Sequence, residues 1–596
     1  MILNLRSRET NLHGAMNTLM LWDGGVPKRL DVSSVSRDGV NLAWSAANDP
    51  EKLLLLPYDN FNWREVAWET SEMHGNISYD QVSALLVVLK LPPGSLPGEA
   101  GRLAGVDNFA QSVRNHHIIP ADEALEQILP TDVDQRTFAD NAVKHVGQIL
   151  CDELAVLLPH QNNLPDFFDP HALPFTKTEE YFLPTYDQEQ SSTRGNMLVI
   201  EHYFPGPVLR MPKEIFESRY AFLLGDRLTT ACDRAAQDQR AVDRSKHRVD
   251  HLSSFEVLSG LMHIVMNQVQ SMGKNAWGAG TTDPVGLSTL LAKLPNRKNI
   301  NLRSIDFYAW LRFMDAILRE LMLRAAMVLL PSMDCLEAEE VKKLAGSTES
   351  GNAVLLMHDL MTYWTPMFYA GGSFNYANEL MELLHNLNHD WPPDISPILR
   401  GGKAAKFKET DIRVEQFNKT LKSHAHGVNA RPGLLEKITP AIGHVQELTE
   451  KVFEDLGVSD EDQHHAKVKQ HKYIILLLDH LCKFKIFDFS QDKVTDHTMV
   501  DLYRTGLHRL AGQDGGHAKH LRRHILRSRS RHFNEMPPED PSAEQPEREA
   551  EIQELQQLDR ELELDNEHPQ LSLLEQLQEL DRWGVDYSDD SIELYD

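Results

Sequence analysis

The sequence predicts an α/β core followed by a large, mainly helical insertion, further C-terminal helices and a disordered acidic tail. Short apolar runs bounded by turn-forming residues occupy the first 226 positions and predict the strands of the core. Long amphipathic patterns follow and predict helices. From Asn534 onward the chain has 21 acidic and 3 basic residues and is rich in Pro, Glu and Gln, which predicts disorder. With 596 residues, 41% of them hydrophobic, the chain is long enough for roughly three to four structural units.

Four short apolar runs are the candidate strands of the core. They are residues 52–63 (KLLLLPYDNFNW), 81–94 (QVSALLVVLKLPPG), 196–205 (NMLVIEHYFP) and 220–226 (YAFLLGD). Runs of this length that are rich in Leu and Val favour buried strands, although periodicity alone does not exclude helix. Between the second and third runs, residues 136–160 carry apolar side chains at helical spacing and predict a helix.

The patterns divide the chain into five parts. The amphipathic stretches 304–330 and 374–387 predict that the region after the fourth strand is helical, and a linker containing Pro and Gly follows at 389–410. No repeat of about 20 to 50 residues indicates a solenoid. The predicted parts are a helical or irregular N-terminal segment (1–50), a strand-rich α/β core (51–226), a helical insertion (227–390), a C-terminal helical part that returns to the core (391–533) and the acidic, largely disordered tail (534–596).

The overall charge says little about partners, because it is unevenly distributed. The formal net charge is −28, but the tail carries −18 of it. Directly before the tail, residues 517–532 (HAKHLRRHILRSRSRH) are strongly basic. This run is suited to neutralising DNA phosphates, to serving as a nuclear-localisation patch, or to folding back onto the acidic tail, and these three interpretations stay open. The tail itself is a candidate surface for a protein partner. The residues that would contact nucleic acid are Arg522, Arg523, Arg527, Arg529 and Arg531.

Cysteine usage and hydropathy indicate the compartment. The four cysteines, Cys151, Cys232, Cys335 and Cys482, lie tens of residues apart without a CxxC pair, which is typical of a reducing environment. The N-terminus lacks the apolar core of a signal peptide, and no window reaches the roughly 18 apolar residues of a membrane span. We therefore expect an intracellular protein, nuclear or cytoplasmic, with no membrane association.

Three acidic residues form the candidate site. Asp59 and Asp226 each stand at the C-terminal end of a candidate strand, where open α/β sheets place ligand-binding and catalytic groups. Glu415 falls on a predicted helix farther along the chain, with Asp411 one turn before it on the same face. Two strand aspartates and a later helix acid are the arrangement of ribonuclease-H-like nucleases and transposases, in which carboxylates hold two Mg²⁺ or Mn²⁺ ions about 3.5 to 4 Å apart. Asp411 and Glu379 are the reserve ligands if Glu415 points away.

Each of these acids also has a purely structural interpretation. Asp226 fits the N-cap of the helix that follows it, and Asp59 fits an Asx-turn in YDNFN. Glu415 fits a solvated helix face on which it pairs with Lys419. Taken singly, the structural interpretation is favoured for each residue. The set of three in this order is what favours a functional site.

The other candidate sites in the sequence are weaker than the three acids. His263 lies among apolar residues in GLMHIVMNQVQ, which is typical of a core histidine with satisfied hydrogen bonds. No Cys or His pairs have the spacing of zinc ligands. The basic stretch RGGKAAKFK (400–408) lacks the GxxxxGK[ST] pattern of a phosphate loop, and no GxSxG hydrolase elbow is present.

Five short motifs in fixed order carry a resemblance to a known family. They are YDNFN (58–62), LLGDRLT (223–229), GLMHIVMN (260–267), FNYANEL (374–380) and DIRVEQFNKTLK (411–422). Over about residues 20–450 the sequence resembles a large family of fungal proteins, multiplied in mushroom-forming fungi, whose shared domain is catalogued as a domain of unknown function. The resemblance implies an origin in a DNA transposon and carries over no established activity. The residues on its motif positions are Asp59, Asn60, Gly225, Asp226, Thr229, Asn375, Tyr376, Glu379, Glu415 and Asn418.

The chain departs from the family pattern in two places. Arg227 stands where Gln is more frequent, and the segment before YDN is short, which implies a lost DNA-binding module or a decayed copy. The leading hypothesis is a transposon-derived protein with a ribonuclease-H-like core that cleaves or transfers DNA phosphodiester bonds. Asp59, Asp226 and Glu415 would be its catalytic residues and the ligands of Mg²⁺ or Mn²⁺. The alternative is a catalytically inactive, helix-rich interaction or scaffold protein, in which the three carboxylates do not converge or Arg and Lys side chains occupy the metal space.

Overall fold

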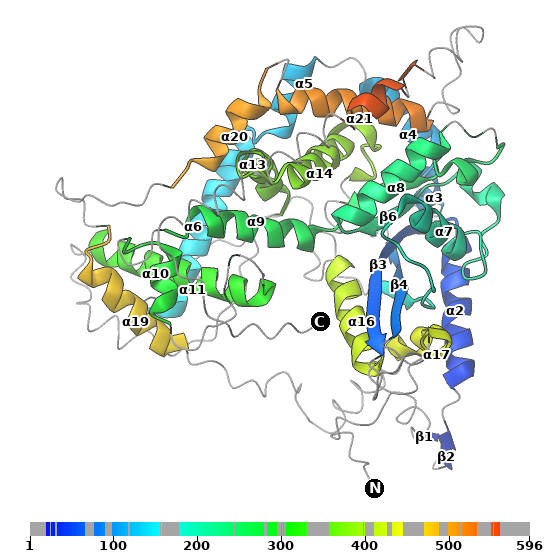
Figure 1. Ribbon diagram of the computed structural model, residues 1–596, viewed down its shortest axis with the longest axis horizontal. Coiled ribbons are helices and arrows are strands. Elements are labelled where there is room, and N and C mark those ends of the chain that lie inside the picture. Colours follow the sequence, from blue (N-terminus) through cyan, green and yellow to red (C-terminus); the bar gives the residue numbers. More distant parts are fainter. Residues whose placement is uncertain are drawn as a thin grey trace, which may run out of the picture.

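In the computed structural model, a five-stranded sheet lies on one side of the molecule and several helices of the insertion lie on the other (Figure 1). The structure describes residues 20–23, 26–29, 32–65, 77–89, 98–116, 120–154, 178–278, 283–294, 306–329, 357–399, 410–425, 432–444, 470–487, 499–532 and 550–560, apart from a few single positions and pairs within these ranges, together with positions 157, 300 and 302.

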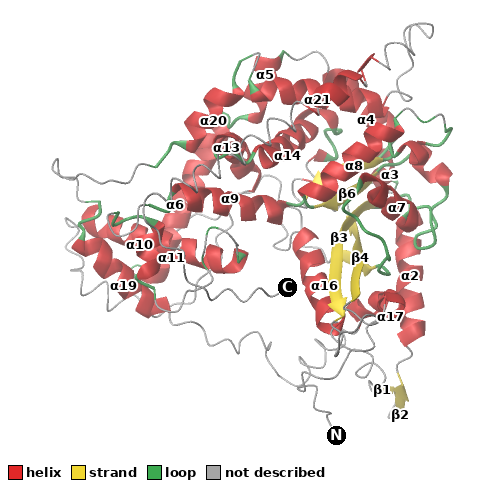
Figure 2. Ribbon diagram, viewed as in Figure 1, coloured by secondary structure: helices red, strands yellow, loops and turns green. Residues whose placement is uncertain are grey.

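The central sheet contains both parallel and antiparallel pairs. Its strands are β3 (Leu53–Glu65), β4 (Ile77–Leu89), β5 (Glu179–Phe182), β6 (Ala221–Gly225) and β7 (Phe255–Ser259). The order across the sheet is β5-β4-β3-β6-β7. β3 and β5 both run antiparallel to β4, whereas β6 runs parallel to β3 and β7 runs parallel to β6. Strands β3, β4 and β6 are labelled in Figure 2. The sheet therefore joins an antiparallel half and a parallel half at β3.

Three of the four predicted strands are confirmed as β3, β4 and β6. β6 reads AFLLG and is buried along its whole length, as expected for a parallel strand that is covered on both faces. Along β3, Leu53 and Leu55 belong to one core, and Leu54 and Leu56 belong to the other, because successive side chains point to opposite faces.

The predicted strand at 196–205 is wrong, because these residues lie mostly in helix α7 (Thr193–Tyr203). The side chain of Ser192 caps the helix by accepting a hydrogen bond at 3.0 Å from the backbone N–H three residues later. Val199 and Tyr203 are both buried and lie four residues apart, which is helical spacing. A short apolar run does not by itself distinguish the periodicity of a helix from that of a strand.

β7 lies within the region that the sequence predicts to be helical. Its five residues, FEVLS, are fully buried beside β6. The run is too short to stand out among the amphipathic patterns around it. The mainly helical insertion therefore begins after Ser259, and α8 (Arg227–Arg240) is the crossover helix between two parallel strands.

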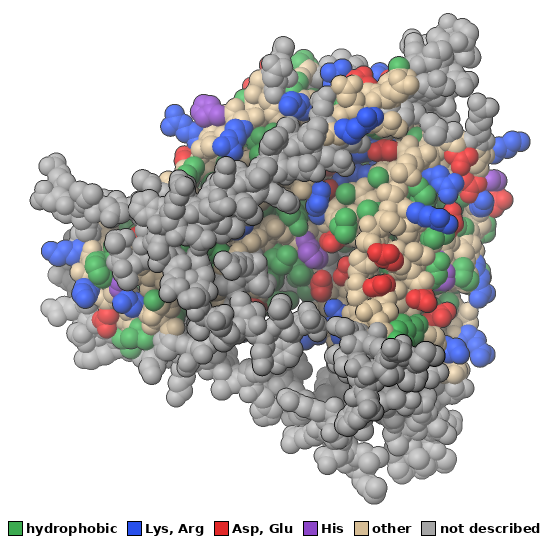
Figure 3. Space-filling view, viewed as in Figure 1, with side chains coloured by type: hydrophobic (Ala, Val, Ile, Leu, Met, Phe, Trp, Pro, Cys, Tyr) green, Lys and Arg blue, Asp and Glu red, His purple; other side chains and the backbone are tan. Residues whose placement is uncertain are grey.

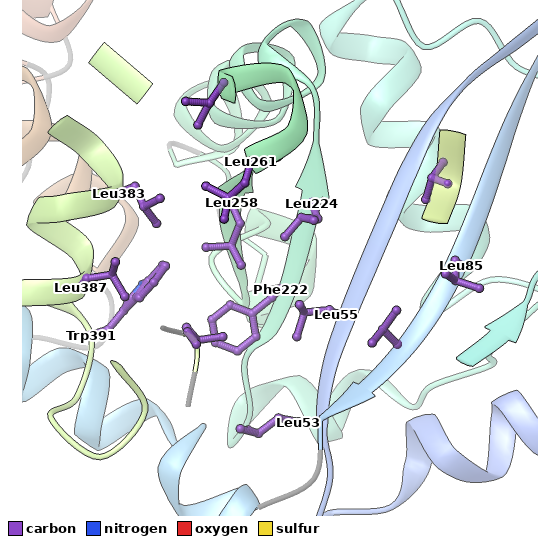
Figure 4. Close-up of a cluster of buried hydrophobic side chains, with 14 of the residues drawn as sticks. Leu53, Leu55, Leu85, Phe222, Leu224, Leu258, Leu261, Leu383, Leu387 and Trp391 are labelled. Atoms are coloured by element: carbon purple, nitrogen blue, oxygen red, sulfur yellow. The ribbon is translucent and has the colours of Figure 1, made fainter. Parts of the chain in front are cut away.

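Helices cover both faces of the sheet and create two cores. On one face, α2 (Val32–Asn48), α7 and α8 pack against the strands. On the other face, α14 (Phe374–His385) and α16 (Thr410–Ala425) contribute buried side chains. Figure 4 shows the second core, in which three sheet residues lie opposite three residues from α14 and the turn after it: Phe222, Leu224 and Leu258 face Leu383, Leu387 and Trp391.

A separate core holds the helices that lie farther from the sheet. Its apolar side chains include Leu290, Trp310 and Leu477, from three different helices. Gly273 allows a close approach in this core, because a Cβ at that position would lie 2.6 Å from the Trp310 ring. The helices concerned are α9 (Leu261–Asn275), α10 (Leu287–Ala292), α11 (Phe307–Leu329) and α19 (Gln470–Lys483), and α6 (Asp132–Glu153) packs against α11 beside them. The helix predicted at 136–160 is confirmed as α6, which starts with a capping box between Thr131 and Asp134.

The remaining elements complete both helical groups and the N-terminal segment. The predicted N-terminal part contains one hairpin and α2, whereas the predicted disordered tail lies outside the described residues except for 550–560. The other elements are β1 (Met20–Asp23), β2 (Val26–Arg29), α3 (Glu99–Leu103), α4 (Val106–His116), α5 (Ala121–Ile128), η2 (Lys213–Glu217), η3 (Arg248–His251), α13 (Met357–Ala370), η5 (Asn386–Asp390), α17 (Pro432–Ile438), η6 (Thr439–Ala441), α20 (Leu502–Leu510) and α21 (Gly516–His532).

Two observations bear on the predicted compartment. None of the helices in the described part of the chain is long and apolar enough to span a membrane. Cys151, Cys232 and Cys482 form no disulfide with one another, and Cys335 lies outside the described residues. The nuclear or cytoplasmic location stays a prediction.

Candidate functional site

The two aspartates lie beside each other where β6 ends next to β3. Asp59 lies within β3, which continues to Glu65, so its predicted position at the end of a strand and the alternative Asx-turn are both wrong. Asp226 directly follows β6, as predicted. The register pairs Pro57 of β3 with Leu224 of β6. Extending this register by two residues places Asp226, which directly follows β6, beside Asp59. Neighbouring strands lie about 4.8 Å apart. In agreement with this placement, the charge of Asp226 helps to raise the pKa of Asp59.

Helix α16 crosses β3 and brings Glu415 to the same place. Val414 is buried in the core against the sheet, which fixes the rotation of the helix. Asn418, one turn later, donates a hydrogen bond from Nδ2 to Oδ2 of Asp59 at 2.9 Å. Ser83 on β4 donates its hydroxyl hydrogen to Oδ1 of Asn418. The amide therefore links the helix, the site aspartate and the neighbouring strand.

Glu415 is partly exposed and lies beside a histidine. Its side chain is 42% exposed, and its Oε1 lies 3.8 Å from Nε2 of His263 on α9. The ion-pair partner that the structure gives to Glu415 is thus a histidine from the insertion. This contact becomes an ion pair when the imidazole is protonated.

Burial and neighbouring negative charges set the protonation of Asp59. Burial, and then repulsion from Glu415 and Asp226, raise the pKa of Asp59 from 3.8 to about 7. The backbone N–H of Asn60 and the nearby His263 oppose this rise but do not cancel it. Near neutral pH, Asp59 is therefore divided between its protonated and ionised forms. Figure 3 shows acidic side chains gathered on the visible face over the sheet and α16.

Asp226 caps a helix as well as lying at the site. Its Oδ1 accepts a hydrogen bond from the backbone N–H of Thr229 at 2.7 Å, as the structural interpretation predicts. Gly225 lets this turn close, because a Cβ there would lie 2.3 Å from Cγ2 of Thr229. The cap uses only one carboxylate oxygen. The structural and functional interpretations of Asp226 are therefore compatible.

On the opposite face of β3, a buried polar contact holds the strand to the helices behind it. The hydroxyl of Tyr58 lies 2.5 Å from Oδ1 of Asp233 on α8 and 3.0 Å from Oδ1 of Asn196 on α7. Burial raises the pKa of Asp233 to about 7, although the hydrogen bond from Tyr58 opposes the rise. This contact fixes the strand position next to Asp59.

Of the two reserve acids, Glu379 is held away from this cluster by another partner. Glu379 on α14 forms a buried ion pair with Arg234 on α8, with Oε1 and Nη1 2.5 Å apart. Its charge is therefore already compensated. The side chain of Asp411 lies outside the described residues.

Sequence reasoning did not place His263 at the site. α9 starts directly after β7, and the backbone N–H of Gly260 donates to the carbonyl oxygen of Gly225 at 2.8 Å, so its first turn reaches the edge that carries Asp226. Tyr376 lies nearby, since the charge of Asp226 is the second cause, after burial, of its raised pKa. The signal that would have identified His263 is its position just after a strand, but that strand was the one not predicted.

A protein-family model matches much of the chain. The model, described as a family of unknown function (DUF6589), covers residues 121–352 and 347–465. The chain belongs to this family. The expected membership in a domain-of-unknown-function family is thereby confirmed. No curated protein and no solved structure matches the DUF6589 chain. The matched residues contain Asp226, His263 and Glu415, and Asp59 lies before them.

The carboxylates of the DUF6589 chain suit a hard divalent cation. In the part of the chain that the structure describes, no three His, Cys, Asp or Glu side chains form a group that could by itself hold a metal ion. Mg²⁺ does not require such a group, because one or two carboxylates bind it together with waters and substrate phosphates. Asp59 and Asp226 supply two carboxylates, and burial, followed by repulsion from Glu415 and Asp226, raises the pKa of Asp59. Bound Mg²⁺ or Mn²⁺ stays a prediction.

The basic run forms α21, in which two of the five arginines are buried in ion pairs and two are exposed. Arg527 makes hydrogen bonds to both carboxylate oxygens of Asp238, at 2.9 to 3.2 Å, and Arg531 lies 3.1 Å from Oε2 of Glu256. Both side chains are buried and serve the fold of this DUF6589 chain. Arg523 lies beside His520 at 3.3 Å. The other two, Arg522 and Arg529, are exposed and pair with Glu554 and Glu551, in the acidic tail.

A second cluster of titratable side chains lies between α14 and α21. Nδ1 of His524 lies 2.9 Å from Oε2 of Glu382, and its Nε2 lies 3.0 Å from Oδ2 of Asp390. Nε2 of His385 lies 3.1 Å from Nε2 of His517, although the two residues are 132 positions apart. These side chains are almost completely buried. The cluster therefore ties the C-terminal helices to the insertion.

Proposed function

We propose that this DUF6589 protein cleaves or transfers DNA phosphodiester bonds with the help of Mg²⁺ or Mn²⁺. Asp59 and Asp226 would be the metal ligands, and Glu415 would be the third acid of the site. One observation carries the proposal: two parallel strands and a helix 189 positions after Asp226 bring these three carboxylates together, and burial, followed by the charges of Glu415 and Asp226, raises the pKa of Asp59.

The order of the elements supports a ribonuclease-H-like core. Three strands form an antiparallel unit, two further strands run parallel to the first of them, and a helix after the insertion packs back on that first strand. Asp59 lies within the first strand of the sheet along the chain, Asp226 directly follows the fourth, and the last acid lies on the returning helix. This is the arrangement expected of a transposase-like protein, and an origin in a fungal DNA transposon is part of the same proposal.

The chain's own residues would orient the acids and handle a proton. The hydrogen bond from Asn418 fixes one oxygen of Asp59, and the helix cap fixes one oxygen of Asp226. When bound, the cation would activate the attacking water or hydroxyl and stabilise the leaving oxygen. Glu415 and His263, 3.8 Å apart and partly exposed, are positioned to accept or donate a proton at the carboxylate and at Nε2.

Thermal unfolding with and without Mn²⁺ tests the metal site. Asp226→Asn is the informative variant, because asparagine is an equally good N-cap and keeps the start of α8. We expect Mn²⁺ to raise the Tm of the unaltered protein, since a ligand that binds only the folded state stabilises it. The Tm of Asp226→Asn should not respond. Asp140→Asn, at an exposed position in α6, should respond like the unaltered protein.

Cleavage of a labelled DNA duplex tests the chemistry. We expect cleavage that depends on Mg²⁺ or Mn²⁺ and is lost in Asp59→Asn, Asp226→Asn and Glu415→Gln but kept in Asp140→Asn. A Tm that ignores Mn²⁺ in the unaltered protein, together with no cleavage, would refute the proposal.

A non-catalytic scaffold is the second candidate function. It is favoured by two observations: the described residues contain no ready-made group of three metal ligands, and Glu415 already has a partner in His263. The scaffold predicts that Asp226→Asn changes neither the response to Mn²⁺ nor any reaction of DNA. The experiments above therefore separate the two candidates.

A further inference from the structure

The exposed face of α21 is a basic strip. Lys519, Arg522 and Arg529 are spaced three and seven residues apart and therefore lie on one side of the helix. The side chains of Arg522 and Arg529 are 66% and 45% exposed. Leu521 and His524, on the other side, are buried. Figure 3 shows Lys and Arg side chains along the edge of the molecule that carries α20 and α21.

A piece of the acidic tail covers this strip. The described residues of 550–560 are helical and lie beside α21, orange-red in Figure 1. Glu554 pairs with Arg522, and Oε1 of Glu551 lies 3.1 Å from Nη1 of Arg529. Leu555 is only 2% exposed, so this segment is docked on the protein through an apolar anchor as well as through its charges.

The contact has the properties of a reversible cover. Both ion pairs are partly exposed, and such pairs are weakly stabilising and screened by salt. Residues 533–549 tether the segment to α21 in sequence, which keeps its local concentration high. A polyanion with several phosphates could therefore displace the segment, whereas a single anion would compete poorly.

We propose that residues 550–560 act as an internal mimic of the nucleic-acid backbone and restrict access of DNA to Lys519, Arg522 and Arg529. Arginine forms the same paired hydrogen bonds with carboxylates and with phosphates, so the two acids occupy positions that phosphates would take. This inference rests on the proposed function for its choice of DNA as the partner. It adds a regulatory step, because the tail must leave α21 before DNA contacts the strip.

Fluorescence anisotropy with a labelled DNA duplex, without divalent metal, tests this regulation in the full-length chain. We expect Glu551→Gln/Glu554→Gln to bind DNA about 3- to 10-fold more tightly than the unaltered protein, because the internal competitor is weakened. The matched control is Asp140→Asn/Glu214→Gln, which removes the same charge at exposed positions in α6 and η2. If both double variants bind equally more tightly, net charge alone explains the gain and the proposal fails.

A second pair of variants tests the strip itself. Adding Arg522→Gln/Arg529→Gln to Glu551→Gln/Glu554→Gln should abolish the gain in affinity and reduce the slope of log K against log salt by about 2. Unchanged affinity after loss of both arginines would overturn the proposal. Because no metal is present, this result is independent of catalysis. Tighter binding without any metal-dependent cleavage would support the tail mechanism and contradict the proposed function.

Discussion

Two clusters of acidic side chains in this protein show opposite electrostatic behaviour. At the sheet edge, burial and neighbouring carboxylates raise the pKa of Asp59 to about 7. Between α14 and α21, burial alone would raise the pKa of Glu382, but His524 and Arg234 hold it well below its usual range. Burial alone would lower the pKa of His524, but the negative charges of Glu382 and Asp390 outweigh burial and raise this pKa to about 10.

The difference between the clusters is whether buried negative charge has a cationic partner. The α14–α21 cluster is balanced by its own histidine and arginine, so it has what a structural ion network requires. At the sheet edge, the described residues give Asp59 a hydrogen bond from the amide of Asn418 and an opposing charge on His263, which burial and the neighbouring carboxylates outweigh. An unbalanced group of acids is typical of a site that gains a positive charge with its ligand.

The largest expected effect is from breaking the balanced cluster. His524→Gln leaves Glu382 and Asp390 buried without their shared cation, so we expect a loss of about 3 to 5 kcal/mol in the free energy of unfolding. Denaturant unfolding measures it. His508→Gln, at an exposed position in α20, is the control and should change stability by less than about 0.5 kcal/mol. Equal, small effects of both substitutions would contradict the balanced-network interpretation.

The pH dependence of the stability of His524→Gln tests whether His524 is charged in the folded protein. The pKa of His524 is higher in the folded state than its ordinary 6.5, so its contribution is complete below pH 6.5 and is lost as pH rises toward about 10. The pKa of Glu382 is lowered, so its contribution is lost as pH falls below about 4.5. The stability gap between the unaltered protein and His524→Gln should therefore be largest near pH 5 to 6.5. A gap that is flat from pH 6 to 10 would mean that His524 is not charged.

A smaller effect of opposite sign is expected at the sheet edge. Asp59→Asn removes a carboxylate whose folded-state pKa is raised, so the variant should be more stable than the unaltered protein by about 1 to 3 kcal/mol at pH 8 without metal. Because ionisation of Asp59 disfavours the folded state as pH rises from about 4 to about 7, the advantage should grow over that interval and then level off. Unfolding curves at pH 5 and pH 8, with Asp140→Asn as the control, measure this. A destabilised Asp59→Asn protein would show that the acids are balanced after all.

The smallest expected effect on stability is from removing the side-chain amide of Asn418, the uncharged partner of Asp59. Asn418→Ala leaves an oxygen of Asp59 and the hydroxyl of Ser83 without this partner, which should lower the free energy of unfolding by about 1 to 2 kcal/mol. Gln416→Ala, at an exposed position of α16, controls for helix propensity. A loss as large as that of His524→Gln would show that an amide holds the site as firmly as a cation holds the other cluster.

The sequence by itself determined the parts of the fold whose signals are local. The apolar runs that predict β3, β4 and β6, and the helical spacing that predicts α6, each lie within a single short segment of the sequence. The position of Asp226 directly after a strand already indicates both a helix cap and a site. The run in α7 was misassigned, because a short apolar stretch fits two periods. β7 was missed because its five residues are identifiable as a strand mainly through their pairing with β6.

Only the tertiary structure decided which of these residues meet. His263 and Asn418 reach Glu415 and Asp59 because α9 and α16 pack at one edge of the sheet, and no local pattern encodes that contact. The same is true of the basic run: Arg531 is buried beside Glu256, 275 positions earlier, whereas Arg529, two residues away, faces outward. Composition fixes the number of charges, but a charge acquires its pKa and its role from the groups that folding brings within a few ångströms.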